Sequence, residues 1–319
     1  INQSVKFDDY EVLAIGEVVR EIQAGFDSFW NSDLSVPMAA FGVNVDPADL
    51  DTWREWLREQ ADAGRSGLYA TALDSRLLQQ IDAGELQPIV ALADLYTDTP
   101  EKIGADVGDE ETAVLVTEVG RRFRAATKEI VIVTPYFIPQ ENGAAIIEEL
   151  LASGVRVVVV TNSLASTNHV PVHSGYARYR TRLLRAGAEI FEVRADAVVE
   201  DENAWGHSPE AMTLHSKATV IDRDTILIGS LNFDPRSLYI NTEMGLFIES
   251  AEAGAGFTRN IFAEIARVTW RVELDQNDRL RWVFDDGTRR EVATSEPQAG
   301  AWRKFQVAFY GLLPIEDQL

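Results

Sequence analysis

Cysteine is absent from this chain of 319 residues, which excludes disulfide bonds and metal sites built on thiolates. Long apolar runs are absent as well. The longest candidate, residues 155–160, has only the length of a strand and is interrupted by Arg156, whereas a membrane-spanning helix needs about 20 apolar residues. We therefore expect no transmembrane segment in this chain. It begins at Ile1 without an initiator methionine or a signal-peptide pattern, which indicates a fragment or a processed product.

Basic residues are too few to balance the acidic ones. The chain holds 29 Lys and Arg against 51 Asp and Glu, so its formal net charge is -22. A field of this sign repels polyanions at long range, which argues against nucleic acid as a partner. It equally opposes electrostatic docking to anionic lipid, although hydrophobic docking would be unaffected.

The first hundred residues read as helical with one strand. Apolar residues recur at helical spacing over 11–30, Pro47 opens a second helix that runs to Gly64, and residues 66–82 read as a third helix. Residues 87–96 read as a strand. Further on, helices and strands alternate: helices over 111–126, 141–152 and 174–186, and strands over 129–134, 155–161 and 189–194. Such alternation predicts an α/β fold whose mixed, mostly parallel sheet is covered on both faces.

The remaining sequence predicts shorter elements. A polar loop over 196–212 leads to three strands, over 214–222, 225–230 and 241–250. A helix over 251–266, a hairpin across 270–284 and a helix over 301–312 complete the chain. The tryptophans mostly fall at core positions of the predicted helices, so we expect them to be buried.

The most informative stretch reads Leu-His-Ser-Lys-Ala-Thr-Val-Ile-Asp. In a strand, side chains two residues apart share a face, so its histidine and lysine, His215 and Lys217, would project the same way. Ser230 and Asn232 repeat that spacing at the end of the next strand, and Glu243 lies at the start of the third. We therefore expect three adjacent strand ends to gather an imidazole, an ammonium, a hydroxyl, an amide and a carboxylate in one pocket.

Each of these groups suits a bound phosphodiester. Neutral imidazole can attack phosphorus or move a proton near neutral pH. The Lys217 ammonium can hold one phosphoryl oxygen, and the Ser230 hydroxyl and Asn232 amide can donate hydrogen bonds to the others. Glu243 could accept the other ring N–H of His215 and so fix its tautomer. The pattern predicts phosphoryl chemistry centred on His215.

Residues 214–243 resemble the HKD motif of the phospholipase D superfamily, and further segments are similar to bacterial cardiolipin synthase C-type proteins. These segments are residues 134–139 (Thr-Pro-Tyr-Phe-Ile-Pro), 161–164 (Thr-Asn-Ser-Leu), 172–176 (Val-His-Ser-Gly-Tyr) and 312–316 (Leu-Leu-Pro-Ile-Glu). The resemblance implies an α/β/α sandwich in which two HKD motifs face each other at a pseudo-twofold axis. It also implies that one histidine forms a covalent phosphohistidine. The other histidine would protonate the leaving alcohol and then deprotonate the incoming one, without a metal or other cofactor.

Only one such motif is present, because among the four histidines only His215 has a lysine two positions on. In the resembled family the first motif precedes a segment similar to residues 12–16 and 29–32, which here lies almost at the N-terminus. We therefore expect three parts: residues 1–108 as the remainder of a first half, 109–270 as the second half, and 271–319 as a C-terminal hairpin and helix. Taken alone, the chain is expected to be inactive or severely impaired. A missing N-terminal half or a second subunit would have to supply the other histidine.

The resemblance also implies a role for each site residue. His215 would be the general acid and base, because the upstream histidine is commonly the nucleophile in this family, and the reverse assignment stays open. Lys217, Ser230 and Asn232 would bind the phosphate, and Glu243 would orient His215.

These residues favour a phosphatidyltransferase or phosphodiesterase of cardiolipin-synthase type. Its substrates would be phospholipids such as phosphatidylglycerol or phosphatidylethanolamine, at the periphery of a bacterial cell membrane. One alternative is a nuclease of the same superfamily that completes its site as a dimer, for which the acidic composition offers no basic groove. Another is an inactive half that serves as an interaction module, which the intact Lys217, Asn232 and Glu243 argue against.

Asp222 and Tyr136 have weaker claims to the site. Asp222 belongs to the motif, but strand parity puts it on the face opposite His215, so we expect it to bind the turn at residues 223–224. Tyr136 follows a strand end and is a candidate for covering lipid.

His173 is a further candidate, because it ends the loop 162–173 that follows a predicted parallel strand and could line the pocket. His169 lies four residues earlier, a spacing that on a helix would suggest a metal pair. Because Pro171 between them should break that helix, we expect no zinc site there.

Overall fold

The computed structural model describes residues 6–42, 46–64, 76–106, 111–197 and 212–319. Its helices are α1 (Val18–Trp30), α2 (Pro47–Gly64), α4 (Arg76–Asp82), α5 (Val114–Ala125), α6 (Gln140–Ala152), α7 (Val170–Ala186), α8 (Pro235–Tyr239), α9 (Ala251–Val268) and α10 (Ala301–Tyr310), with short 3-10 helices η1 (Met38–Phe41), η2 (Pro100–Lys102) and η3 (Glu316–Gln318). Its strands are β1 (Lys6–Asp8), β2 (Leu92–Thr97), β3 (Glu129–Val133), β4 (Arg156–Asn162), β5 (Glu189–Val193), β6 (Met212–Leu214), β7 (Ala218–Ile221), β8 (Thr225–Gly229), β9 (Met244–Glu249), β10 (Thr269–Leu274), β11 (Leu280–Asp285) and β12 (Arg290–Ala293). Most of the expected loop over 196–212, with His207, and the start of the helix expected over 66–82 lie outside the described residues. None of the described helices is long and apolar enough to cross a bilayer.

The chain divides into two compact units. The smaller unit, residues 31–89 and 199–209, contributes the described helices η1, α2 and α4. The larger unit, residues 1–30, 90–198 and 210–319, holds every described strand. This grouping differs from the expected division at residues 108 and 270, because β2 pairs with β9 and because β10, β11 and β12 extend the same sheet. The expected division remains a proposal about which residues belong to each half of a two-motif protein.

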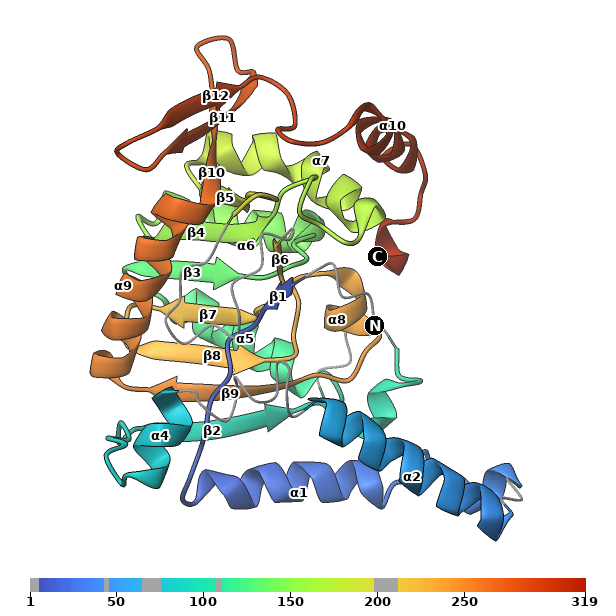
Figure 1. The fold of residues 1–319 in the computed structure, drawn as a ribbon. Coiled ribbons are helices and arrows are strands. Elements are labelled where there is room, and N and C mark those ends of the chain that lie inside the picture. Colours follow the sequence, from blue (N-terminus) through green and yellow to red (C-terminus); the bar gives the residue numbers. More distant parts are fainter. Residues whose placement is uncertain (1–5, 43–45, 65–75, 107–110, 198–211) are drawn as a thin grey trace. The chain divides into compact units, whose positions relative to one another are not determined.

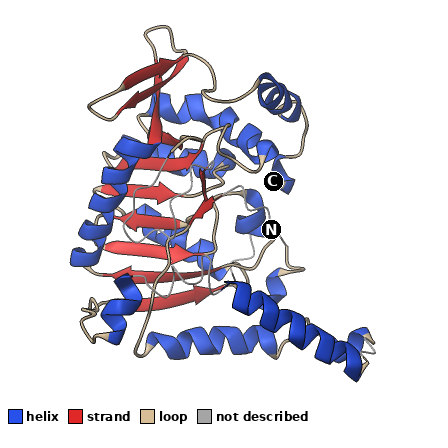
Figure 2. Ribbon diagram, in the orientation of Figure 1, coloured by secondary structure: helices blue, strands red, loops and turns tan. Residues whose placement is uncertain are grey.

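A ten-stranded mixed sheet forms the centre of the larger unit, in the order β12-β11-β10-β5-β4-β3-β7-β8-β9-β2 (Figures 1 and 2). The predicted mixed α/β sheet is confirmed, but the expectation that it is mostly parallel is wrong. Within the described sheet, only β3 with β4 and β4 with β5 pair in parallel. All other neighbours in this sheet pair antiparallel.

Helices on both sides explain why the central strands are apolar throughout. All of β3 is buried, and so is every residue of β4 after Arg156. Helices α5, α6 and α7 lie on one side of the sheet, and α9 crosses the other (Figure 1). A strand covered on both faces needs a continuous apolar run rather than alternation, which is what these two strands have.

Several strand and helix boundaries near the candidate site differ from the predicted ones. The strand expected over 214–222 is interrupted, since β6 ends at Leu214 and β7 begins at Ala218. The strand expected from Asn241 begins only at Met244, after the unforeseen short helix α8. Helix α7 begins at Val170 rather than Ser174, because Pro171 fits its first turn instead of breaking it.

The expectation of buried tryptophans is only partly right. Trp270 and Trp282, both on strands, are buried, whereas the helical tryptophans among the described residues are exposed: Trp30, Trp53, Trp56 and Trp302. Helical spacing shows that a helix has an apolar face but not that another element covers it.

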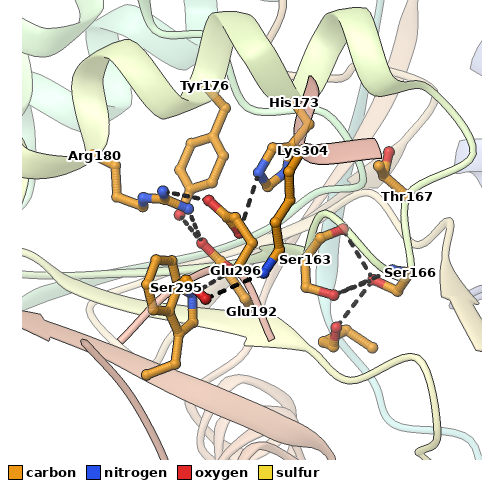
Figure 3. A network of polar contacts seen from close by, with 12 residues as sticks. Ser163, Ser166, Thr167, His173, Tyr176, Arg180, Glu192, Ser295, Glu296 and Lys304 are labelled. Atoms are coloured by element: carbon orange, nitrogen blue, oxygen red, sulfur yellow. Dashed lines mark hydrogen bonds and ion pairs between the residues drawn. The ribbon is translucent and has the colours of Figure 1, made fainter. Parts of the chain in front are cut away.

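A buried polar cluster under α7 joins that helix to β5 and β11 (Figure 3). The carboxylate of Glu192, fully buried, accepts hydrogen bonds from the Tyr176 hydroxyl at 2.9 Å, from Arg180 at 2.7 Å and from the Trp282 indole at 2.8 Å. Arg180 also donates to Glu296 at 2.6 Å. Because each charge in the cluster is paired, its burial is tolerated.

Replacing Glu192 with alanine should therefore destabilise the fold by about 3–5 kcal/mol, because it leaves the Arg180 charge with one partner fewer in the interior. Urea denaturation measures this loss of unfolding free energy. Glu149→Ala, which removes an exposed carboxylate on α6, is the matched control. A loss for Glu192→Ala no greater than that of the control would show that the cluster does not hold α7 to the sheet.

Candidate active site

One edge of the sheet collects the residues that the motif predicts. Strands β3 and β8 run toward this edge, while the antiparallel strands β7 and β9 start from it. His215 and Lys217 precede β7, Ser230 and Asn232 follow β8, and Glu243 precedes β9. The three chain segments therefore meet at neighbouring strand ends.

His215 is contacted by a carboxylate that the sequence did not reveal. Its Nδ1 lies 2.9 Å from Asp9 Oδ2 and 3.0 Å from Oδ1. The parallel pairing of β1 with β6 ends at the residues just before these two, so Asp9 and His215 emerge next to each other. The carboxylate that contacts the ring is thus Asp9, whereas Glu243, the predicted partner, accepts from Ser230. An acceptor at Nδ1 keeps the proton on that nitrogen, which leaves Nε2 for chemistry.

Lys217 folds back toward His215. Its Nζ donates a hydrogen bond to the His215 carbonyl at 2.6 Å and lies 3.2 Å from Nε2 of the ring. Burial lowers the pKa of the Lys217 ammonium, against the raising effect of Asp9, Glu243 and Asp234. Imidazole and ammonium therefore point at the same place, as strand parity predicts, although residues 215–217 are not in a strand.

Ser230 and Glu243 form a second contact pair at this edge. The Ser230 hydroxyl donates to the Glu243 carboxylate and accepts from Met244 N at 3.1 Å. Gly229 makes this approach possible, because a Cβ there would lie 2.2 Å from the Met244 carbonyl oxygen. Burial raises the pKa of Glu243. The glycine of this Gly-Ser pair is therefore required by the close approach of the backbone at Met244.

A buried ion pair missed by the sequence analysis supports Glu243. Asp98 and Lys102 are 1% and 4% exposed, and their carboxylate and ammonium lie 2.6 Å apart. Asp98 also accepts from Glu243 N at 3.0 Å and from Leu115 N at 2.9 Å, and Lys102 donates to the Ser237 carbonyl at 3.2 Å. In the sequence, Asp98 and Lys102 stand four residues apart with Pro100 between them. This spacing does not identify the groups that they bind.

The Asn232 amide is held by Ser237. Its Nδ2 donates to the Ser237 hydroxyl at 3.4 Å, and Ser237 is itself fixed by Asp234, whose carboxylate caps α8 at 2.8 Å. Asn232 Oδ1 is buried and has no hydrogen-bond partner within the described part of the chain. A half-turn of the side chain exchanges the amide oxygen and nitrogen. Asn232 can therefore offer a ligand either an acceptor or a donor.

Asn162 fixes the backbone just before His215. At the end of β4, its side chain donates to the Leu214 carbonyl at 2.9 Å and accepts from Leu214 N at 3.0 Å. Ser166 donates to the same amide oxygen at 3.1 Å. The buried side-chain amide of Asn162 thus makes the two hydrogen bonds to the Leu214 backbone that a neighbouring strand would otherwise make.

Asp222 lies at the opposite end of β7 from His215. Its carboxylate accepts hydrogen bonds of 2.7–3.2 Å from the backbone N–H groups of residues 127–129 and from the Thr127 hydroxyl. It therefore ties β7 to the start of β3, rather than binding the turn at residues 223–224 as expected. Burial raises the pKa of Asp222, but the hydrogen bonds from Thr127 and Lys128 outweigh this and lower it overall.

Tyr136, His169 and His173 have partners of their own. The Tyr136 hydroxyl donates to Asn168 at 3.0 Å, and its ring contacts that of His169 edge-on. His173 does not lie in a loop but in the first turn of α7, where its ring is 3% exposed. Its Nε2 lies 3.7 Å from a Glu296 oxygen, so the ring faces the buried cluster of Figure 3 rather than an open pocket. No group of His, Cys, Asp and Glu suited to a metal ion occurs among the described residues.

The comparison with protein families identifies the central part of the chain. Residues 119–265 match the family described as "Cardiolipin synthase, PLD-like domain". This segment contains β3 to β9 and the motif residues from His215 to Glu243, whereas Asp9 lies outside it. These residues form a phospholipase D-like domain, and the resemblance inferred from the motif is confirmed.

The chain is similar to longer bacterial proteins. Cardiolipin synthase C of Escherichia coli (strain K12) is 29% identical over 315 residues, which cover 97% of this chain and 66% of that protein. An uncharacterized protein of Helicobacter pylori (strain ATCC 700392 / 26695) is 26% identical over 247 residues, which cover 76% of this chain and 48% of the relative. The chain thus spans at most about two thirds of these relatives.

Solved structures show more distant similarity. Phosphatidylserine synthase of Haemophilus influenzae Rd KW20 is 19% identical, with a TM-score of 0.42, over 58% of this chain and 40% of that one. Nuc from Salmonella typhimurium, a phospholipase D family member, is 14% identical, with a TM-score of 0.39, over 56% of this chain and 97% of that one.

Asp222→Asn should lower the unfolding free energy by about 2 kcal/mol at pH 7, because the carboxylate accepts several hydrogen bonds and asparagine retains only one acceptor oxygen. Asparagine also tolerates the left-handed backbone at this position, where φ is 54°. The native pKa is lowered, so the charged form stabilises the fold above the ordinary value of 3.8 and this contribution is lost as the pH falls through the native pKa.

Urea denaturation of both proteins from pH 7 to acid pH measures this effect, and the difference between them should shrink as the pH falls. Asp94→Asn, at an exposed position on β2, is the control. A difference that persists unchanged at acid pH would contradict a role for the ionised Asp222 carboxylate.

Proposed function

We propose that this chain is one half of an enzyme that transfers or hydrolyses the phosphatidyl group of a phospholipid. The observation that carries the proposal is the convergence of His215 and Lys217, with Asp9 at the Nδ1 of the ring, at one sheet edge of a phospholipase D-like domain. The relative named cardiolipin synthase C, which aligns over nearly the whole chain, supports a phospholipid substrate.

The proposed reaction has two steps. A second histidine attacks phosphorus, so that a P–N bond forms and the P–O bond to the leaving alcohol breaks, while His215 gives its Nε2 proton to that alcohol oxygen. An acceptor alcohol, or water, then loses its proton to His215 and attacks phosphorus, which breaks the P–N bond. Lys217, Ser230 and Asn232 hold the phosphoryl oxygens during both steps.

Asp9 changes the role that we propose for Glu243. Asp9 belongs to the residues expected to come from a first half, yet it contacts the histidine of the second. If the two halves are related by a pseudo-twofold axis, the carboxylate of the second half faces the other histidine in the same way. We therefore assign Glu243 to that second histidine, which a segment encoded before Ile1 or a second copy of the chain would supply.

The decisive experiment incubates the chain, and the chain extended by the segment encoded upstream of Ile1, with vesicles of phosphatidylglycerol or phosphatidylethanolamine. Mass spectrometry should find phosphatidyl-transfer or hydrolysis products with the extended chain and little or none with the 319-residue chain. DNA in a parallel reaction should stay intact. Cleavage of DNA without lipid products would favour the nuclease alternative, and no product from any substrate would favour an inactive interaction module.

Lys217→Ala in the active form should reduce turnover by about 10²–10³-fold, because it removes the cation that stabilises the phosphoryl charge.

Asp9→Asn should reduce turnover on the order of 10²-fold, because the amide cannot stabilise a protonated ring. Initial rates of lipid product formation measure both. Lys128→Ala and Asp94→Asn, at exposed positions away from this edge, should retain the full rate. Full activity of Asp9→Asn would exclude Asp9 as the partner of His215 in the reaction.

A further inference from the structure

A large apolar cavity lies behind the site, between α5 and α6. Its volume is about 610 Å³, within the range of small-molecule pockets. The floor is the β3 residue Ile132, and the walls include Val116 of α5 and Ile147 of α6. The cavity is lined mainly by apolar side chains, so its occupant should be apolar too.

Both facing helices line the cavity with a glycine. Gly120 lies in the interior of α5 and Gly143 in α6, and both line the space. A Cβ at Gly120 would meet only the flexible end of Arg124, at 3.3 Å. Packing therefore does not require glycine at this position, although glycine weakens a helix relative to alanine or leucine. What the glycine provides is room.

The cavity adjoins the candidate active site through Phe233. This residue follows Asn232, and it lines both the large cavity and a small one of about 10 Å³ beside Lys217. Leu238 and Tyr239, on the short helix after Asn232, also line the large cavity. From there the lining continues along α5 from Ala113 to Arg124.

The length of this lining suits a lipid tail. Eleven residue steps of α-helix, from 113 to 124, span about 16 Å. The hydrocarbon core of a bilayer is about 30 Å thick, so the chains of one leaflet reach about 15 Å. The lining along α5 is therefore about as long as a single acyl chain, and Phe233, which stacks on Phe123 of α5, lies beside it.

We propose that this cavity holds one acyl chain of the phospholipid whose phosphate is bound at Lys217 and Asn232. The inference rests on the proposed function for the position of the phosphate. The cavity itself rests on independent observations, namely its volume, its glycines and its shared wall at Phe233.

Calorimetric titration with two alkyl phosphates, dodecyl phosphate below its micelle concentration and butyl phosphate, separates the tail from the phosphate. Each methylene that leaves water contributes about a fourfold gain in affinity, and part of this is lost in ordering the chain. The dodecyl compound should therefore bind at least about tenfold more tightly than the butyl compound. Gly120→Leu should abolish that advantage and leave the affinity for butyl phosphate unchanged.

Gly256→Leu on α9 is the matched control, because a Cβ there also meets only an arginine side chain, Arg259 at 3.8 Å. Both leucine variants should raise the melting temperature of the protein slightly, since leucine favours helix over glycine. Only Gly120→Leu should affect binding. A Gly120→Leu protein that keeps the full preference for dodecyl phosphate would overturn the proposal.

Lys217→Ala makes the two failures distinguishable. It should weaken the binding of both alkyl phosphates by the same factor. If it does so while Gly120→Leu has no effect, the phosphate site stands and the acyl cavity is excluded. If Gly120→Leu weakens dodecyl phosphate while Lys217→Ala changes neither affinity, a tail binds in the cavity but its phosphate does not lie at Lys217, and the proposal as stated fails.

Discussion

The position of β7 between β3 and β8 is the constraint on which the site depends. Its antiparallel register sets Ala218 opposite Val133 on one side and Ile228 on the other. The residues before β7 therefore emerge where β3 and β8 end. A shift of one residue would turn every side chain of β7 to the other face. Asp222 locks this register from the far end, because its carboxylate accepts backbone N–H groups that precede and begin β3.

Burial of charge at the site is tolerated because each buried charge has specific partners. Asp98 is surrounded by donors from Lys102, Glu243 N and Leu115 N, so one carboxylate connects η2, α5 and the start of β9. Lys217 is different, since burial lowers its pKa and the carboxylates around it raise it. An anionic phosphate would supply to Lys217 the same favourable interaction that Asp98 gives Lys102. The half-buried ammonium of Lys217 thus favours the binding of an anion there, although the chain as a whole is strongly acidic.

The sequence predicts which motif residues lie close together better than it predicts the contacts that each of them makes. Its short-range pattern was enough to bring His215, Lys217 and Ser230 together, because the strand ends that carry them are close in sequence. It could not identify Asp9, since 206 positions separate this residue from His215 and only the pairing of β1 with β6 joins them. Because the sequence does not show the contact between Asp9 and His215, it leaves Glu243 as the predicted partner of the His215 ring.

Local rules also failed where a residue has two possible roles. Pro171 breaks a helix in its interior but suits a first turn, and the structure uses the second property, so His173 lies on α7. The alternation of helices and strands that predicts a mostly parallel sheet is confined to residues 111–194. Of the later strands, β7 and β8 are joined by a short turn, which requires antiparallel pairing, and β9 also pairs antiparallel with β8 after a longer connection that contains α8.

The net charge of the chain limits which interactions could supply the free energy of lipid binding, and the apolar cavity offers one that charge does not affect. At -22 the molecule gains nothing from long-range attraction to an anionic membrane surface. The free energy that draws a phospholipid out of a bilayer must then come from short-range contacts. One phosphate at Lys217 offers few of these, and the charged carboxylates nearby oppose others. Apolar burial does not depend on the sign of the protein's charge. A cavity that accepts a tail would therefore supply binding free energy that does not depend on the net charge, and would do so near the residues that we propose to react.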